Sequence, residues 1–149
     1  MSGRRYVAVV GPGEASVDEV ARAEEVGRLL AARDAVVVCG GLGGVMEAVS
    51  RGAAGAGGTV VGILPGNHRD QANEHVTVAI ATGMGEMRNA LVVRSVDAVV
   101  AVGGAYGTLS EIALALRTGV PVVGIGTWDL DDVVVAPDAR AAVELALEL

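Results

Sequence analysis

Apolar and polar positions alternate in blocks along the chain, with short β-branched runs followed by longer segments of helical spacing. The apolar runs predict strands at residues 5–10, 35–39, 59–64, 76–81, 98–102, 122–125 and 133–135. The longer segments predict helices from about 17 to 32 and over 45–54, 86–95, 109–118 and 139–147. This alternation predicts an α/β fold, a single doubly wound Rossmann-like domain over residues 1–149 with a mainly parallel sheet.

Local signals support these boundaries. Ser16 and Glu19 have the spacing of a capping box and predict the start of the first helix. Gly119 and Pro121 predict the end of the helix over 109–118. One long polar segment, residues 67–75, interrupts the pattern, and a loop of this length in a small domain is often a lid or a binding loop.

The composition fits a sheet that is covered on both faces. Hydrophobic residues make up 52% of the chain and Phe is lacking, so the core must consist of Val, Leu, Ile and Ala. Strands buried on both faces of a parallel sheet have this composition. The chain contains 22 glycines, a number that suits many tight turns between strands and helices.

Charge and hydropathy bear on the partners of the protein. The net charge of −7 argues against a nucleic-acid partner, which would favour a basic surface. No apolar run reaches the roughly 20 residues that a membrane span needs, and the N-terminal residues do not have the layout of a signal peptide. We therefore expect a cytoplasmic protein with no membrane partner.

We predict no metal site. The single cysteine, Cys39, excludes an internal disulfide and is expected to be a small buried side chain. His68 and His75 lie in the polar loop without a third ligand at metal spacing, so we interpret them as solvated. Three aspartates within 129–132 lack the glycine and the glutamate of a calcium loop and predict a turn.

The stretch 99–111 carries the main chemical signal. A β-branched run leads through a glycine-rich turn directly into a helix, and such a turn presents free backbone N–H groups where the helix dipole is positive. Phosphate is the natural ligand of that arrangement. The candidate binding residues are those of this turn, together with glycines of two further strand-to-helix turns: Gly104, Ala105, Tyr106, Gly107 and Thr108; Gly41, Gly43 and Gly44; Gly11 and Gly13.

The predicted topology brings these turns together. Right-handed crossovers place the turns at 11–15, 40–44, 82–87 and 103–108 on one edge of the sheet. Ligands of such sheets bind at the carboxyl ends of the strands, where the strand order reverses. We expect that point between the strands at 5–10 and 98–102.

With these residues assembled, the chain resembles the LOG (Lonely Guy) superfamily, and most of all its branch of molybdenum-cofactor carrier proteins. The family signature Pro-Gly-Gly-x-Gly-Thr-x-x-Glu corresponds to Gly103-Gly104-Ala105-Tyr106-Gly107-Thr108-Leu109-Ser110-Glu111. The upstream Arg-Lys motif corresponds to Arg88-Asn89. Two departures stand out, since Asn89 replaces the lysine and Gly103-Gly104-Ala105 replaces Pro-Gly-Gly.

The resemblance implies a nucleoside monophosphate or a phosphate-bearing cofactor as ligand. It implies that Arg88 and Glu111 support cleavage of the N-glycosidic bond to base and ribose 5-phosphate, a hydrolysis that needs no cofactor. The carrier branch instead implies a protein that carries a nucleotide or the molybdenum cofactor without cleaving it. The resemblance also implies a homodimer or a higher homo-oligomer, for which the apolar faces of helices 86–95 and 109–118 are candidate interfaces.

Simpler interpretations stand beside each of these roles. Thr108 and Glu111 have capping-box spacing, so Glu111 could close the helix start instead of, or as well as, acting on a ligand. Arg88 could face solvent and pair with Glu86 or Asp97. The function classes that remain are a phosphoribohydrolase, a carrier or sensor, and a structural protein that keeps the glycine turns for packing.

Overall fold

The computed structural model describes residues 3–149, so Met1 and Ser2 of the N-terminal segment lie outside the described residues. The strands are β1 (Tyr6–Val10), β2 (Val36–Cys39), β3 (Val60–Leu64), β4 (Val78–Ala81), β5 (Ala98–Val102), β6 (Val122–Ile125) and β7 (Val134–Val135). The helices are α1 (Val17–Ala32), α2 (Val45–Gly55), α3 (Arg88–Arg94), α4 (Tyr106–Arg117) and α5 (Ala139–Glu148), with 3₁₀ turns η1 (Arg69–Gln71) and η2 (Gly85–Met87).

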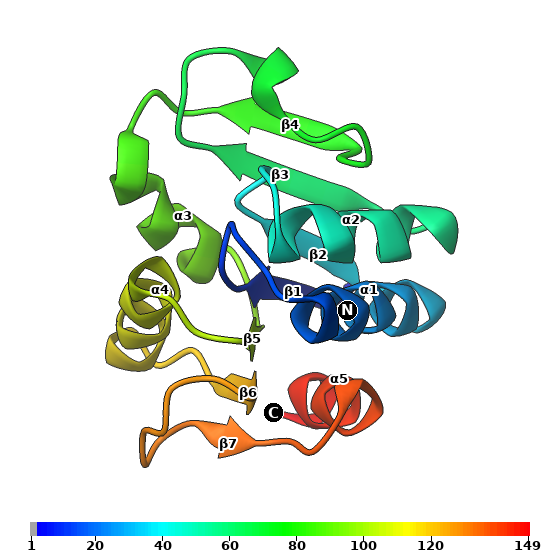
Figure 1. Ribbon diagram of the computed structural model, residues 1–149, viewed down its shortest axis with the longest axis vertical. Coiled ribbons are helices and arrows are strands. Elements are labelled where there is room, and N and C mark those ends of the chain that lie inside the picture. Colours follow the sequence, from blue (N-terminus) through cyan, green and yellow to red (C-terminus); the bar gives the residue numbers. More distant parts are fainter. Residues whose placement is uncertain (1–2) are drawn as a thin grey trace.

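All seven strands form one parallel sheet in the order β4-β3-β2-β1-β5-β6-β7. Helices α1, α2 and α5 cover one face, and α3 and α4 cover the other (Figure 1). The predicted doubly wound Rossmann-like fold is therefore confirmed. The strand order reverses between β1 and β5, which is the predicted position.

Valine dominates the buried inner strands, and β1 shows why, because helices cover both of its faces. In β1, Val7 and Val9 belong to the cluster under α1, α2 and α5, whereas Ala8 and Val10 belong to the cluster under α3 and α4. All four side chains are at most 2% exposed. Burial on both faces explains why the strand sequences read as continuous apolar runs.

The start of α1 has the predicted cap. The Ser16 hydroxyl accepts a hydrogen bond from the Glu19 N–H at 3.1 Å, and the Ser16 N–H donates to Glu19 Oε1 at 2.9 Å. This reciprocal pair satisfies two backbone donors that the first turn of a helix otherwise leaves free. It also fixes the point at which the chain leaves the turn after β1.

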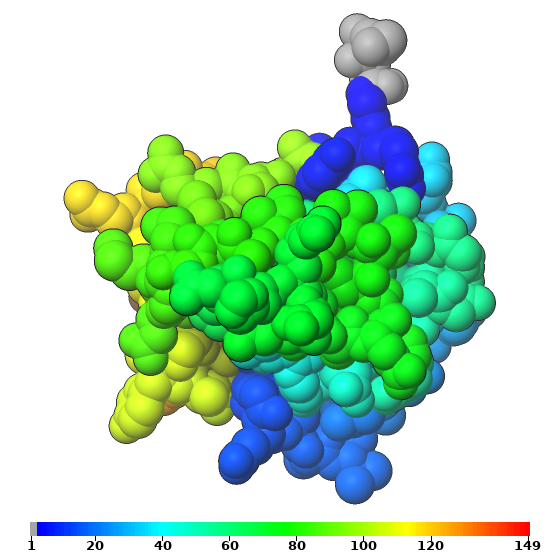
Figure 2. Space-filling view, turned by 90° about the horizontal axis from the view of Figure 1, so that it is seen from above, coloured from blue at the N-terminus to red at the C-terminus, as the bar shows by residue number. Residues whose placement is uncertain are grey.

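The edge strand β4 has no covering helix of its own. The connection from β3 to β4 contains only the short turn η1, and Val78 and Ile80 are each 46% exposed. Figure 2 looks onto this end of the molecule, where residues of the segment around β4 spread over the surface in green. The parallel sheet thus has one end covered mainly by loop residues.

Two further features of the chain agree with the composition. Cys39 is fully buried at the end of β2, as expected. Burial raises the pKa of its thiol, while a contact with the Ser50 hydroxyl acts in the opposite direction. Among the helices of residues 3–149, none has the length and apolar character needed to cross a bilayer.

The turn after β1 approaches its neighbours closely, and this gives a stability test. A Cβ at Gly11 would clash with the Val102 carbonyl of β5 and would lie 2.7 Å from a methyl of Val45. We expect Gly11→Ala to lower the free energy of unfolding by about 1–3 kcal/mol, because backbone and helix would have to move apart. Urea unfolding measures the loss.

Gly13→Ala is the matched control for this substitution. A Cβ at Gly13 meets no atom within 4 Å, so its stability should stay close to that of the unaltered protein. Equal losses in the two variants would contradict a role for close packing at Gly11.

Candidate functional site

A cavity of about 200 Å³ opens at the carboxyl edge of the sheet, where the strand order reverses. Its lining comes from the ends of β1 and β2 and from the first turns of α2, α3 and α4. The lining residues are Val9, Val10, Gly11, Pro12, Gly13, Gly40, Met46, Arg88, Asn89, Ala105, Gly107, Thr108 and Glu111. The turns after β1 and β5 and the start of α3 therefore meet as the topology predicts.

The N-terminus of α4 forms one wall of this cavity. Helix α4 begins at Tyr106, and its N-cap is Ala105 in an extended conformation, so no side chain caps the helix. The first N–H groups of a helix have no partner inside the helix. Because Ala105, Gly107 and Thr108 line the cavity, these donors and the positive end of the helix dipole lie at its wall.

The expected capping box of α4 is wrong. Because the helix begins at Tyr106, three residues earlier than predicted, Thr108 lies inside its first turn and cannot be the N-cap. Its Oγ1 atom is buried and has no hydrogen-bond partner in the described part of the chain. Buried hydroxyls usually have a partner, so this atom is free to meet a ligand.

Glu111 is one turn further along α4 and is only 7% exposed. Burial raises the pKa of its carboxyl group to about 7, and the nearby positive charge of Arg88 partly offsets that rise. A carboxyl group with this pKa exchanges its proton near neutral pH. Buried groups of this kind in a cleft are typical of sites that bind or transform a ligand.

Arg88 is the first residue of α3 and points inward. It is 9% exposed, so the alternative of a solvent-facing arginine is wrong. Asp97, one of its suggested partners, instead accepts a hydrogen bond from the Tyr6 N–H at 2.9 Å. Arg88 Nε donates to the Ile63 carbonyl at 2.9 Å, and Nη1 donates to Oδ1 of Asn89. These bonds hold the guanidinium beside the cavity and leave it with donors to spare.

Gly40 and Met46 also line the cavity, although neither was among the predicted binding residues. A Cβ at Gly40 would lie 2.5 Å from Arg88 Nη2 and 2.6 Å from Met46 Sδ, so glycine makes room for both side chains. Arg88 Nη2 lies 3.5 Å from the Gly40 carbonyl. The signal available was position, because Gly40 is the first residue after β2 at the carboxyl edge.

Five of the predicted binding residues do not line the cavity, namely Gly41, Gly43, Gly44, Gly104 and Tyr106. The turn before α2 packs against the turn after β1: the Val45 N–H donates to the Pro12 carbonyl at 3.1 Å, and Gly44 has a φ of 65°. A side chain at Gly44 would clash with that same carbonyl. The residues Gly41, Gly43 and Gly44 therefore lie behind the turn after β1 and support it, and they do not form the cavity wall.

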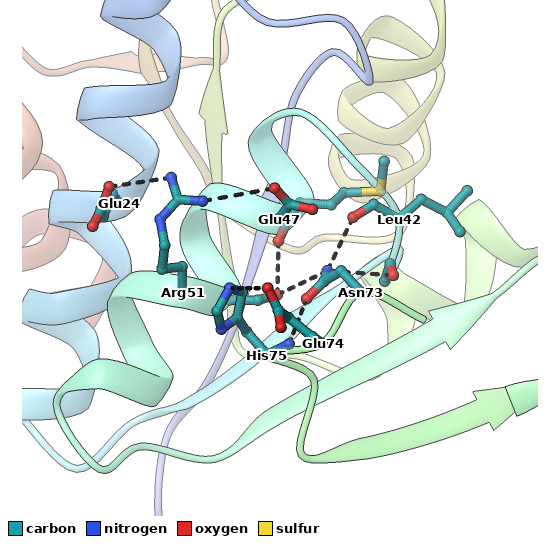
Figure 3. Close-up of polar contacts among 10 residues, drawn as sticks. Glu24, Leu42, Glu47, Arg51, Asn73, Glu74 and His75 are labelled. Carbon is teal, nitrogen blue, oxygen red and sulfur yellow. Dashed lines mark hydrogen bonds and ion pairs between the residues drawn. The ribbon is translucent and has the colours of Figure 1, made fainter. Parts of the chain in front are cut away.

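The polar loop over 67–75 is tied to that turn through Asn73 (Figure 3). Its side-chain amide donates to the carbonyls of Leu42 at 2.9 Å and Gly41 at 3.3 Å, and its own N–H donates to Gly41 O at 2.8 Å. Residues Asn67 to Asp70 line a separate hollow beside β4. Through Asn73 the loop is thus hydrogen-bonded to the turn over 40–44 and holds it in place.

The histidines do not gather with other metal-binding side chains. His75 lies 3.6 Å from Glu74, its neighbour in sequence, as Figure 3 shows. Within residues 3–149, no group of three or more His, Cys, Asp or Glu side chains has the proximity needed to hold a metal ion.

The chain belongs to the SLOG cluster4 family, whose match spans residues 4–146. Its fold and sequence also agree closely with two solved structures. The molybdenum cofactor binding protein of the phototrophic bacterium Rippkaea orientalis is 35% identical, with a TM-score of 0.94 over 99% of this chain and 98% of that one. The molybdenum cofactor carrier protein of Chlamydomonas reinhardtii is 32% identical, with a TM-score of 0.89 over 99% and 98% of the two chains.

The chain is also similar to LOG-type proteins of plants. It is 38% identical over 104 residues to a probable cytokinin riboside 5′-monophosphate phosphoribohydrolase of rice, Oryza sativa subsp. japonica. That match covers 68% of this chain and 42% of the rice protein, so the chain spans less than half of that relative's length. The LOG-like family with a carrier-like branch, inferred from the sequence motifs, is thus confirmed.

The pKa of Glu111 gives a test by pH. Below pH 4.5 the carboxyl is protonated in both the folded and the unfolded protein. Between pH 4.5 and about 7 the unfolded chain loses this proton first, so the free energy of unfolding falls as pH rises, by about 3 kcal/mol in total. Glu111→Gln removes this contribution, and the variant should gain about that much relative to the unaltered protein between pH 4.5 and 8.

Urea unfolding at a series of pH values measures this difference. The control is Glu86→Gln, which alters an exposed glutamate in the turn before Arg88. Its difference from the unaltered protein should change much less over the same pH range. A Glu111→Gln difference that stays constant with pH would contradict the raised pKa.

Proposed function

We propose that this protein binds a nucleotide-type ligand through its phosphate group in the cavity between β1 and β5. The observation that carries the proposal is the N-terminus of α4, which no side chain caps and which lines the cavity through Ala105, Gly107 and Thr108. Phosphate oxygens would accept hydrogen bonds from the first N–H groups of that helix. The unpartnered Thr108 hydroxyl would donate a further bond.

A charged ligand also suits the rest of the wall. Arg88 brings a buried positive charge, and its side chain is already oriented by Ile63 and Asn89. A preoriented guanidinium binds an anion at a smaller entropic cost than a free one. Phosphate near α4 and Arg88 would leave the remainder of the nucleotide close to Glu111.

We further propose that Glu111 promotes hydrolysis of the N-glycosidic bond of a nucleoside 5′-monophosphate. The reaction breaks the bond between C1′ and the base, adds the hydroxyl of water to C1′ and transfers a proton to the base. Positive charge develops on the ribose as the bond breaks, and an ionised Glu111 would stabilise it or accept the proton of water. A pKa of about 7 suits this role, because the group is partly ionised at neutral pH.

Product release from a panel of nucleoside 5′-monophosphates tests the hydrolase. We expect base and ribose 5-phosphate in equal amounts, and a loss of at least about 100-fold in rate with Glu111→Gln, the size typical of losing a general acid or base. The Glu86→Gln variant, altered at an exposed position, should retain the activity. Release that persists in Glu111→Gln would contradict the assigned role.

The alternative is a carrier that holds the molybdenum cofactor or a nucleotide without cleaving it. It is favoured by the likeness to the Rippkaea orientalis and Chlamydomonas reinhardtii proteins, which extends over nearly the whole of each chain. Under this hypothesis the α4 N-terminus and Arg88 still bind a phosphate group, since the cofactor also carries one. Glu111 then has no bond to cleave.

The carrier is tested by mixing the protein with cofactor released from a molybdoenzyme and removing the unbound fraction. We expect molybdenum and pterin to remain with the protein in equal amounts. Thr108→Val should reduce the retained fraction several-fold, because the lost hydroxyl corresponds to about 1 kcal/mol of hydrogen bonding. Nucleotide cleavage without retention of the cofactor would favour the hydrolase instead.

We also propose a homodimer, as the family resemblance implies. Light scattering coupled to size-exclusion chromatography should give twice the chain mass of 14.9 kDa. A single peak at the chain mass would contradict this proposal.

A further inference from the structure

One aromatic side chain outside the cavity contacts the turn that forms its wall. Trp128 lies in the connection between β6 and β7, and its Nε1–H donates a hydrogen bond to the Ala105 carbonyl at 3.0 Å. Ala105 is the N-cap of α4, and its carbonyl also accepts the first helical bond, from the Leu109 N–H at 3.0 Å. Two donors from different parts of the chain therefore hold one carbonyl group.

Holding this carbonyl fixes the peptide unit between Ala105, which lines the cavity, and Tyr106, whose N–H is the first of α4. A peptide unit is planar, so the Ala105 carbonyl and the Tyr106 N–H lie in one plane and point in opposite directions. The carbonyl is directed along the helix to Leu109, and the N–H is therefore directed out of the helix N-terminus. Because the plane cannot rotate while Trp128 and Leu109 both donate to it, the N–H direction is set before a ligand arrives.

The residues on either side of Ala105, Gly104 and Tyr106, both lie against the indole of Trp128. A Cβ at Gly104 would lie 3.1 Å from Trp128 Nε1, so glycine permits the indole to approach the carbonyl. The Tyr106 ring stacks on Trp128 with centroids 6.1 Å apart and an angle of 25° between the planes. Gly104 and Tyr106, which do not line the cavity, thus both contact the residue that holds its wall.

We propose that Trp128 is a positioning residue that sets the geometry of the α4 N-terminus for binding the ligand's phosphate group. This inference rests on the proposed function and adds a residue from a separate connection of the chain to it. Trp128 itself lies behind the turn and acts through Ala105. Its contribution is greatest for ligands that bear phosphate.

The test compares the affinities for adenosine 5′-monophosphate and adenosine by calorimetry. In Trp128→Phe a smaller aromatic ring replaces the indole and the N–H donor is lost. We expect its dissociation constant for the monophosphate to rise about fivefold or more, the factor that one neutral hydrogen bond represents. The constant for adenosine should change less than twofold. Amide hydrogen exchange in the segment 103–109 should become faster.

Two further variants separate a loss of positioning at the phosphate site from a general loss of stability. Gly104→Ala crowds the indole and should weaken monophosphate binding in the same selective way, which keeps the test open if Trp128→Phe folds poorly. Val143→Ala removes buried methyl groups in α5 and should lower stability without changing the ratio of the two affinities.

The outcomes separate this inference from the proposed function. Unaltered protein that binds neither the monophosphate nor inorganic phosphate overturns the proposed function, and the inference with it. Unaltered protein that binds the monophosphate, with Trp128→Phe binding it equally well, overturns the role of Trp128 alone. Equal weakening of both ligands in Trp128→Phe also overturns it, because positioning of the phosphate turn predicts a selective loss.

Discussion

The pairing of β1 with both β2 and β5 is the constraint on which the site depends. Val7 lies opposite Val37 in β2 and opposite Ala98 in β5, so β1 occupies the middle of the parallel sheet. The connections that follow β1 and β5 leave toward opposite faces, since α1 covers one and α4 the other. A cavity forms between them at the carboxyl edge, where no helix crosses from one strand to the next.

The chemistry of that cavity depends on burial. Arg88 and Glu111 are both nearly excluded from water, and the positive charge of Arg88 lowers the pKa of Glu111 against the larger effect of burial. Arg88 offsets its own burial with hydrogen bonds to the Ile63 carbonyl and to Asn89, whereas burial leaves the Glu111 carboxyl with its pKa raised. The cavity wall therefore holds a guanidinium group that has hydrogen-bond partners close to a carboxyl group whose pKa is raised. This asymmetry suits the binding of an anion beside a group that exchanges protons.

Asn89 stands where the LOG motif has lysine, and it is the direct neighbour of Arg88 in the cavity wall. LOG-type sequences have lysine at this place, and here the shorter amide accepts a hydrogen bond from Arg88. The substitution removes a positive charge from the cavity wall and gives Arg88 a neutral partner. Arg88 is thereby the cation that the described part of the cavity wall offers to a ligand.

Local sequence patterns were enough to predict the helices and strands and their order along the chain. Runs of valine, the Ser16 cap and the glycine turns are local signals. They predicted all seven strands, a mainly parallel sheet and the meeting of the turns after β1 and β5. The resemblance to the LOG superfamily pointed to Arg88 and Glu111, and both residues line the cavity. Helix α4 shows the limit of such prediction. Thr108 has the sequence signal of an N-cap, but the helix begins earlier, after the extended residue Ala105.

Which turn residues face the cavity depends on how the turns pack against one another. Gly40 lines it whereas Gly41, Gly43 and Gly44 lie behind it, because the turn before α2 packs on the Pro12 carbonyl. The inward direction of Arg88, the raised pKa of Glu111 and the contact of Trp128 with Ala105 likewise arise between segments distant in sequence. Such contacts depend on how close two backbones come in space, and local sequence patterns do not encode that distance.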